Sequence, residues 1–364
     1  MQINHQINKP FAITIVALCM ILLISACQPQ VTQTQTPPHA PTRLPSVTLS
    51  PETIETQPIT PTKSMPVAQT PLKTAMPSGQ VTLMAVGDIM LARTIGDLIL
   101  TRGIEAPFEF TASMLNKADI ALGNLECAIS ERGEPLNKTY TFRAPTEAGK
   151  ALSYAGFDLL TLANNHVLDF GEDAFLDTLE NLKANQIAFV GAGQDNTGAR
   201  QPVIIEANGL RLAFLAYLDI PRWNYDYLGW IATPTKPGVA WGYLSDIQSD
   251  VSAATKIADV VIVLMHFGIE GQSQPSYQQI QSAHLAIDSG AKLVIGSHTH
   301  LLQSIEKYKD GLIVYNLGNF VFDEFVEPEN RSAIFMARIT KDGVLAHKLI
   351  PVRLQENGIP IINR

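Results

Sequence analysis

The chain has 364 residues, of which 46% are hydrophobic and 16% are charged, and its formal net charge is −8. This composition is too apolar for a disordered protein, and no apolar run after residue 27 is long enough to span a bilayer. General nucleic-acid binding needs a basic footprint, so the acidic balance argues against a nucleic-acid partner.

The first 27 residues have the pattern of a secretory signal. One basic residue, Lys9, precedes an apolar stretch over residues 11–24, and small residues then precede Cys27. The run ISAC (24–27) resembles the lipobox of bacterial lipoproteins, in which the cysteine carries the lipid. We therefore expect an extracytoplasmic protein that is anchored to a bacterial membrane through lipid on Cys27. The alternative is a signal peptide cut elsewhere or a single uncleaved anchor.

A Pro-rich segment follows this signal. Residues 28–80 hold 11 of the 23 prolines, interleaved with Thr and Gln. Such a segment cannot bury enough apolar surface to order itself. The sequence thus predicts a signal peptide over 1–27, a tether over 28–80 and a folded domain over 81–364. Of the three cysteines only Cys127 lies in that domain, so the domain must fold without a disulfide.

From residue 81 onward, short apolar runs alternate with helical patterns. Continuous Val, Ile and Leu runs predict strands buried on both faces, and Asn208-Gly209 and Asp342-Gly343 predict antiparallel hairpins. Covering helices are expected over 172–186 and 275–291. The fold class is therefore α/β with mixed sheets. The predicted strands lie at 81–86, 119–122, 157–163, 187–190, 202–207, 211–217, 260–265, 292–295, 312–317, 333–340 and 344–354.

Polar residues directly follow five of these strands. In open α/β sheets, ligands bind at the carboxyl ends of the strands, so we expect these side chains to meet at one rim. Four of the six histidines beyond residue 80 lie there. The residues concerned are Asp88, Asn124, Glu126, Asn165, His166, His266, His298 and His300.

These residue types point to a metal centre. His298 and His300 are two positions apart, so in an extended chain their imidazoles point to the same side. With carboxylates and an amide oxygen from neighbouring strands, they form a mixed N/O set that suits Mn, Fe or Zn better than Ca. Two such ions could share a bridging carboxylate. The alternative is that these residues are helix caps and turn residues at strand ends.

The order of these motifs resembles that of calcineurin-like metallophosphoesterases. The blocks GDIMLAR, GNLE, TFRAP, LANNHVLDFG, HFGIE, GSHTHLLQSIEKY and LGNFVFD more closely resemble the CapA family of capsule proteins, which is linked to poly-γ-glutamate synthesis and export. The resemblance covers nearly all of residues 81–323. It implies a four-layer α/β/β/α sandwich that lies outside the membrane on an anchor.

The resemblance also implies roles for individual residues. Glu126 would bridge two metals, and His166 would be the general acid that protonates a leaving group, with Asp169 orienting it. Typical phosphoesterases have Asp-x-His in the first block, whereas this chain has Met90 in place of the histidine. One or two ions are therefore expected. The implied metal ligands are Asp88, Glu126, Asn165, His266, His298 and His300.

Other residues are candidates for contact with a substrate. Arg143 could hold a carboxylate or phosphate, or it could pack on Tyr140 or Phe142 instead. The loop over 221–243, with three tryptophans, could cap a cleft or pack its own aromatic rings. The candidate substrate-binding residues are Asn124, Arg143, Glu270 and Asn319.

Together these features predict an exported, lipid-anchored protein that acts in synthesis, processing or export of an anionic capsule polymer such as poly-γ-glutamate. A hydrolase-type site with Mn, Fe or Zn is expected, and membrane proteins of capsule synthesis or export are the expected partners. Two alternatives stay open. One is an extracytoplasmic metal-dependent phosphoesterase, and the other is a polymer-binding scaffold without catalysis.

Overall fold

The computed structural model describes residues 78–222 and 226–363. The predicted signal peptide (1–27) and nearly all of the predicted tether (28–80) lie outside these residues. Within the described ranges, no helix combines the length and apolar character needed to cross a bilayer. Cys127 is buried and unpaired, as a domain with one cysteine requires.

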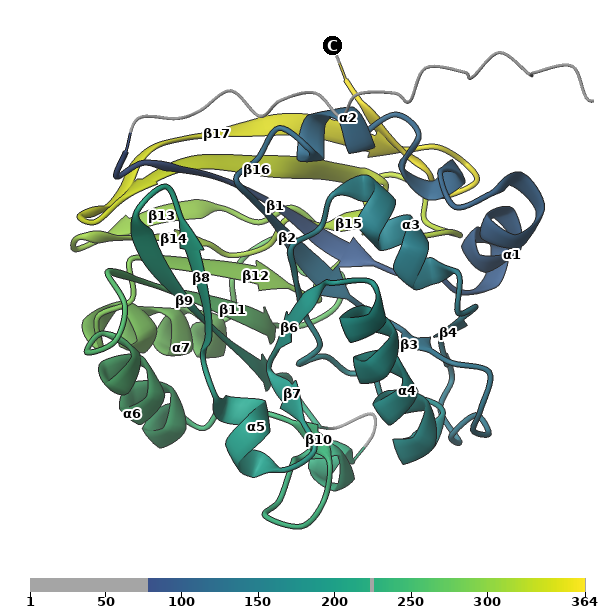
Figure 1. Cartoon of the computed structure of the whole chain (residues 1–364), viewed down its shortest axis with the longest axis horizontal. Helices are drawn as coiled ribbons and strands as arrows, with labels where there is room; N and C mark the ends of the chain where they lie inside the picture. The colour runs from purple at the N-terminus through teal and green to yellow at the C-terminus, as the bar shows by residue number, and fades with distance from the viewer. Residues whose placement is uncertain (1–77, 223–225, 364) are drawn as a thin grey trace, which may run out of the picture. The chain divides into compact units, whose positions relative to one another are not determined.

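The first of two mixed sheets has the strand order β18-β17-β16-β1-β2-β5-β6, and β15 also pairs with β1 (Figure 1). The strands β15, β1, β2, β5 and β6 run parallel to one another. β16 pairs antiparallel with β1, and β17 and β18 extend the sheet by antiparallel pairing of β16 with β17 and of β17 with β18. The strands are β1 (Val81–Ile89), β2 (Ile120–Leu125), β5 (Leu159–Thr161), β6 (Ala188–Val190), β15 (Asn319–Val321), β16 (Arg331–Thr340), β17 (Gly343–Leu354) and β18 (Pro360–Ile362).

The second mixed sheet has the order β13-β14-β12-β11-β9-β8. Its four central strands are parallel, and its two edge strands are antiparallel to their neighbours. Both predicted hairpins are confirmed, because β8 pairs antiparallel with β9 and β16 with β17. The strands are β8 (Val203–Ala207), β9 (Leu210–Asp219), β11 (Val260–Phe267), β12 (Leu293–Ser297), β13 (Ile305–Tyr308) and β14 (Gly311–Val314).

Two pairs of very short strands complete the sheet structure of the described residues. They are β3 (Ala128–Ile129) with β4 (Arg143–Ala144), and β7 (Ala192–Gly193) with β10 (Gly238–Val239).

Helices cover the outer faces of both sheets, which confirms the predicted α/β/β/α sandwich. Apolar residues of α6 and α7 share one core cluster with the second sheet, and residues of α1, α3 and α4 pack with the first (Figure 1). The helices are α1 (Arg93–Arg102), α2 (Ala112–Leu115), α3 (Ala148–Ala155), α4 (Gly171–Ala184), α5 (Asn196–Arg200), α6 (Leu244–Ala254) and α7 (Tyr277–Asp288), with 3-10 turns at η1 (Ala106–Phe108) and η2 (Tyr227–Trp230).

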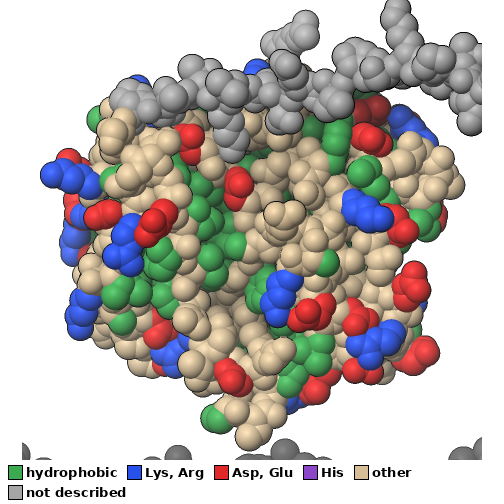
Figure 2. Space-filling model, in the orientation of Figure 1, with side chains coloured by type: hydrophobic (Ala, Val, Ile, Leu, Met, Phe, Trp, Pro, Cys, Tyr) green, Lys and Arg blue, Asp and Glu red, His purple; other side chains and the backbone are tan. Residues whose placement is uncertain are grey.

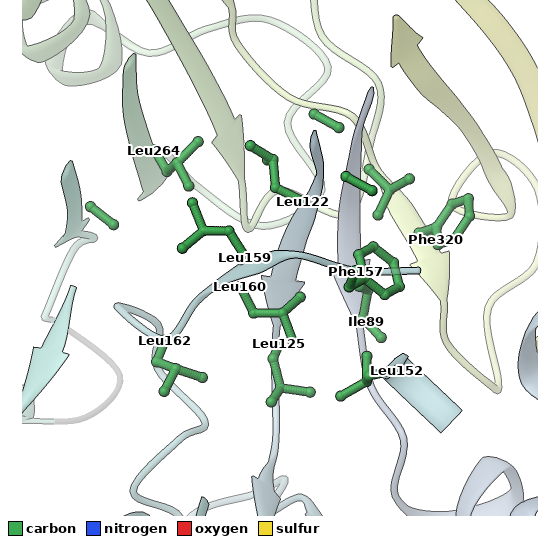
Figure 3. Packing of buried hydrophobic residues seen from close by; sticks show 14 of the residues in the cluster. Ile89, Leu122, Leu125, Leu152, Phe157, Leu159, Leu160, Leu162, Leu264 and Phe320 are labelled. Carbon is green, nitrogen blue, oxygen red and sulfur yellow. The ribbon is translucent and has the colours of Figure 1, made fainter. Parts of the chain in front are cut away.

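Strand alternation sends β11 side chains to two different cores. Val261 and Val263 face α6 and α7, whereas Ile262 and Leu264 face the first sheet. Figure 3 shows Leu264 beside Leu122 and Leu159, which come from the first sheet. The same alternation turns His266, at the end of β11, toward the space between the sheets.

The charged surface contributes little to this architecture. On the face that Figure 2 shows, acidic and basic side chains are interspersed rather than separated by sign. Exposed ion pairs such as Lys183–Glu180, with 2.8 Å between Nζ and Oε1, are worth only about 0–1 kcal/mol each. The stability of the domain therefore comes mainly from the two apolar cores.

At Gly87, β1 passes very close to the backbone of Gly318, the residue that precedes β15. A Cβ atom there would lie 1.8 Å from the Gly318 carbonyl oxygen, which also accepts the Asp88 N–H at 3.0 Å. We expect Gly87→Ala to lower the free energy of unfolding by about 3 kcal/mol, measured by urea denaturation, because backbone must move. Gly229→Ala is the control, since a Cβ there meets nothing within 4 Å. Equal stability of the two variants would contradict the packing described here.

Candidate metal centre

The structure brings the predicted ligands together from both sheets. Asp88 lies on β1 and Glu126 directly follows β2, while Asn165 follows β5 of the same sheet. His266 is the last residue but one of β11 in the second sheet, and His298 follows β12. All five are buried, at 4% exposure or less. Side chains that are far apart in the sequence therefore share one interior site.

Asn124 holds the two acidic side chains in place. Its Nδ2 atom donates to Asp88 Oδ1 at 2.8 Å and to Glu126 Oε2 at 3.3 Å. Asn164 fixes the orientation of this amide by donating to its Oδ1 atom at 3.0 Å. Asn124 therefore lies behind the carboxylates, so its predicted contact with a substrate gains no support.

The donor set fits a divalent cation. One ligand atom each from Asp88, Glu126 and His266 lie within 4.8 Å of one another. Two buried atoms, Glu126 Oε1 and His298 Nδ1, have no hydrogen-bond partner among the described residues. Buried polar atoms rarely lack a partner, and a carboxylate oxygen and an imidazole nitrogen are both ligands for Mn, Fe or Zn. The group could therefore hold a metal ion.

Burial and neighbouring charges shift the pKa values of these residues in different directions. Burial and the charge of Asp88 raise the pKa of Glu126 well above its usual range. Burial lowers the pKa of His266 far below the usual value, and that of His298 to about 3. At neutral pH both imidazoles are uncharged, which leaves a nitrogen lone pair for a cation.

His300 belongs to a separate corner of the site. Its Nδ1 atom lies 2.8 Å from Asn319 Oδ1 and 3.6 Å from Asp88 Oδ2. Burial opposes charge on both partners, but their mutual attraction outweighs it, so the pKa of His300 is raised and that of Asp88 is lowered. The Met90 sulfur is buried and accepts the Ala92 N–H at 3.1 Å. The number of ions stays a prediction.

His166 contacts Asp169, the residue that was predicted to orient it. Its Nδ1 atom lies 2.6 Å from Asp169 Oδ2, and its Nε2 atom lies 3.9 Å from Glu126 Oε1. Burial lowers the pKa of His166 to about 4, although Asp169 acts in the opposite direction. At neutral pH the ring is therefore uncharged, with its proton on Nδ1. In this state Nε2 accepts a proton, and the predicted acid role requires that it first take one up.

Lys138 was missed by the sequence predictions. Its Nζ atom lies 2.6 Å from Asp169 Oδ1 and also contacts the Asn165 carbonyl oxygen. The side chain is only 6% exposed, and the ammonium lies 4.7 Å from the Trp230 ring centroid and 5.3 Å from that of Tyr227. Lys138 lies in a polar loop and does not directly follow an apolar run, so the sequence offers no reason to place it at the site.

A cavity of about 690 Å³ opens onto this site. Four predicted residues line it, namely Asn165, His166, Glu270 and His298, and a substrate could reach them through it. Tyr227 of the 221–243 loop lines the cavity and also packs edge to face on Trp230, so both roles considered for this loop are present. The other lining residues are Asn137, Lys138, Thr139, Tyr140, Ile220, Pro221, Gly268 and Ile269.

Arg143 is engaged elsewhere. Its guanidinium donates to the carbonyl oxygens of Arg132 and Gly133 and lies 4.3 Å from the Phe170 ring centroid. It is absent from the residues that line the cavity. Contact of Arg143 with a substrate stays a prediction, and Lys138 is the basic residue that the fold places at the cavity wall.

The family model described as "Bacterial capsule synthesis protein PGA_cap" matches residues 82–324, which include every residue of the site. The chain belongs to this family. The resemblance to CapA proteins is thereby confirmed.

Two similar proteins show how far the similarity extends. The "Capsule biosynthesis protein CapA" of Bacillus anthracis is 32% identical over 287 residues, which cover 77% of this chain and 69% of that protein. The "PGA biosynthesis protein CapA" of Bacillus subtilis (strain 168) is 29% identical over 292 residues, which cover 79% and 76%. A solved structure of a hypothetical protein from Thermus thermophilus is 15% identical, with a TM-score of 0.49 and coverage of 74% of this chain and 98% of that chain.

Removal of the Lys138 ammonium should destabilise the domain. We expect Lys138→Met to lower the free energy of unfolding by about 3 kcal/mol, because Asp169 is then left as a buried carboxylate without its cation. Lys183→Met, which breaks an exposed pair, should cost less than about 0.5 kcal/mol. Urea denaturation measures both, and a similar small loss in the two variants would contradict the buried ion pair.

Substitution of Glu126 should raise the stability of the metal-free protein and weaken metal binding. Because burial and Asp88 disfavour its charged form, we expect Glu126→Gln to raise the stability of the chelator-treated protein by about 1 kcal/mol. The same change should weaken Zn²⁺ affinity at least ~10-fold. Thermal denaturation and Zn²⁺ titration check the two effects. Glu131→Gln, at an exposed site, should change neither, and unchanged Zn²⁺ affinity in Glu126→Gln would exclude this carboxylate as a ligand.

Proposed function

We propose that this chain acts in the synthesis, processing or export of an anionic capsule polymer, poly-γ-glutamate. The observation that carries this proposal is the similarity to two proteins named for capsule and PGA biosynthesis, over more than three quarters of the chain. The family match over residues 82–324 supports it, because it covers the second sheet, the parallel strands of the first sheet and the buried site.

The proposed reaction is hydrolysis or transfer at an amide bond of the polymer. The residues that would hold the ion are Asp88, Glu126 and His266, with Asn165, His298 and His300 around them. A bound Mn, Fe or Zn ion would supply Lewis-acid polarisation of the carbonyl oxygen. The side chains of Asp88, Glu126 and His266 are at most 1% exposed, and burial strengthens the electrostatic interactions among them.

His166 is the proton-transfer residue in this proposal. Asp169 keeps the ring proton on Nδ1, so Nε2 is the atom that takes a proton from the attacking nucleophile. The same atom then gives that proton to the amine that leaves when the amide bond breaks. Lys138 stabilises the negative charge of Asp169 and thereby holds the orientation of the His166 ring.

The cavity wall suits part of an anionic chain. Lys138 and Glu270 both line it, so a substrate carboxylate would be attracted to the ammonium of Lys138 and repelled by the carboxylate of Glu270. This asymmetry would set the direction in which an acidic polymer enters.

The proposal includes export and lipid anchoring through Cys27. The small residues that precede this cysteine, after an apolar stretch, support it. A lipid at residue 27 and a long Pro-rich segment would keep the domain outside the membrane, where a capsule polymer emerges. Membrane proteins of capsule synthesis or export are the partners that fit this position.

Incubation of the purified protein with poly-γ-glutamate and Mn²⁺ tests the function. We expect the polymer chains to be shortened or transferred, as measured by size-exclusion chromatography. His298→Ala should reduce the rate about 100-fold or more, because it removes a buried ligand, whereas exposed His347→Ala should not.

A second substrate and a metal analysis of the same protein distinguish the alternative functions. Hydrolysis of bis(p-nitrophenyl) phosphate without any change in the polymer would favour a phosphoesterase. Polymer binding without turnover, in a protein that holds no metal, would favour a scaffold. Either result would contradict the proposed reaction.

A further inference from the structure

His266 is a buried imidazole with a partner at each ring nitrogen. It is 1% exposed, and its Nε2 atom lies 2.8 Å from Asn165 Oδ1. Its Nδ1 atom lies 2.9 Å from Ser297 Oγ and 3.2 Å from Asn124 Nδ2. The two groups near Nδ1 differ chemically, because an amide nitrogen only donates, whereas a hydroxyl both donates and accepts.

Without a cation, these contacts favour a proton on Nε2. The Asn165 Oδ1 atom is an acceptor, so Nε2–H donates to it and Nδ1 carries the lone pair. The two amide hydrogens of Asn124 are donated to Asp88 and Glu126, so the Ser297 hydroxyl is the group that donates to Nδ1. The orientation of the Asn124 amide is fixed, since reversing it would place its oxygen 2.8 Å from the Asp88 carboxylate.

A bound cation would require the other tautomer of His266. If Asn165 Oδ1 and His266 Nε2 are both ligands, Nε2 must offer its lone pair and the ring proton must lie on Nδ1. That proton then needs a buried acceptor. Asn124 cannot accept it, whereas Ser297 Oγ can, at 2.9 Å.

We propose that Ser297 is a positioning residue that holds His266 in its metal-binding tautomer by accepting the Nδ1 proton. This inference rests on the cation site of the proposed function. Ser297 acts only through the imidazole, and its hydroxyl serves both states of the ring because it can reverse its role.

The sheet explains why a serine stands at this position. β11 and β12 are parallel neighbours, and His266 pairs in register with Ser297. The residues two positions earlier, Leu264 and Ile295, both face the core between the sheets. Ser297 continues that apolar row and is 5% exposed, so its hydroxyl would be costly to bury without a partner.

Zn²⁺ affinity of the purified full-length protein tests the inference, measured by competition with a chromophoric chelator. We expect Ser297→Ala to weaken binding about 10- to 100-fold, and Ser297→Thr, which keeps the hydroxyl, to remain within about threefold of the wild type. Ser332→Ala is a matched control, since this buried serine on β16 donates only to the Leu317 carbonyl oxygen among its described contacts. Wild-type affinity in Ser297→Ala would overturn the inference.

The position of the ring proton gives a second readout. In protein labelled with ¹⁵N-histidine, the His266 signals, assigned with His266→Gln, should show Nε2–H in chelator and Nδ1–H after Zn²⁺ is added. A proton that stays on Nε2 with Zn²⁺ bound would also overturn the inference. A wild-type chain that binds no Zn²⁺ would instead refute the proposed cation site, and the role of Ser297 would fall with it.

Discussion

The repulsion between Asp88 and Glu126 is the constraint around which the site is built. Both carboxylates are fully buried, and their ligand atoms lie within 4.8 Å of each other. At an effective dielectric constant near 20, two ionised carboxylates 4.8 Å apart repel by roughly 3.5 kcal/mol, and burial together with this repulsion raises the pKa of Glu126. Asn124 relieves part of this by donating to both groups, yet Glu126 Oε1 keeps no hydrogen-bond partner among the described residues. A divalent cation would compensate the charge that remains.

This arrangement requires both sheets. The first supplies the acids and the amides, and the second supplies His266 and the turn that carries His298. His298 has a φ of 99°, which a non-glycine residue rarely adopts, and its N–H donates to Asp88 Oδ2 at 3.2 Å. The backbone is thus held in an unfavourable conformation where it contacts a site carboxylate. The two apolar cores stabilise the domain enough to maintain that conformation.

Much of the fold was predictable, because buried parallel strands appear as continuous Val, Ile and Leu runs, and tight turns appear as Asn-Gly or Asp-Gly. Asp88 and His266 were predictable for a related reason, since each closes an apolar run. Helices α1 and α6 were not predicted. The first contains Gly96 and begins at Arg93, whose φ is 51°, and the second is rich in Ser and Asp, so neither has a strong helical pattern.

The side chains that support the site were beyond sequence reasoning. Lys138 lies in the loop between β3 and β4, and Arg143 begins β4, yet nothing in their local sequence says which one reaches the cavity. Contacts with Asp169 and Trp230 place Lys138, and not Arg143, at the cavity wall. The proposed role of Ser297 likewise depends on the strand register that places it beside His266, which the sequence does not reveal. Such contacts depend on pairing between distant segments, which apolar patterns do not encode.

Anomalous X-ray diffraction from crystals soaked in Mn²⁺ tests the central claim most directly. The account predicts a peak inside the domain, within about 2.0–2.3 Å of oxygen or nitrogen atoms of Asp88, Glu126 and His266. A map in which the only manganese peaks lie on the surface, with Glu126 Oε1 still without a partner, would contradict it.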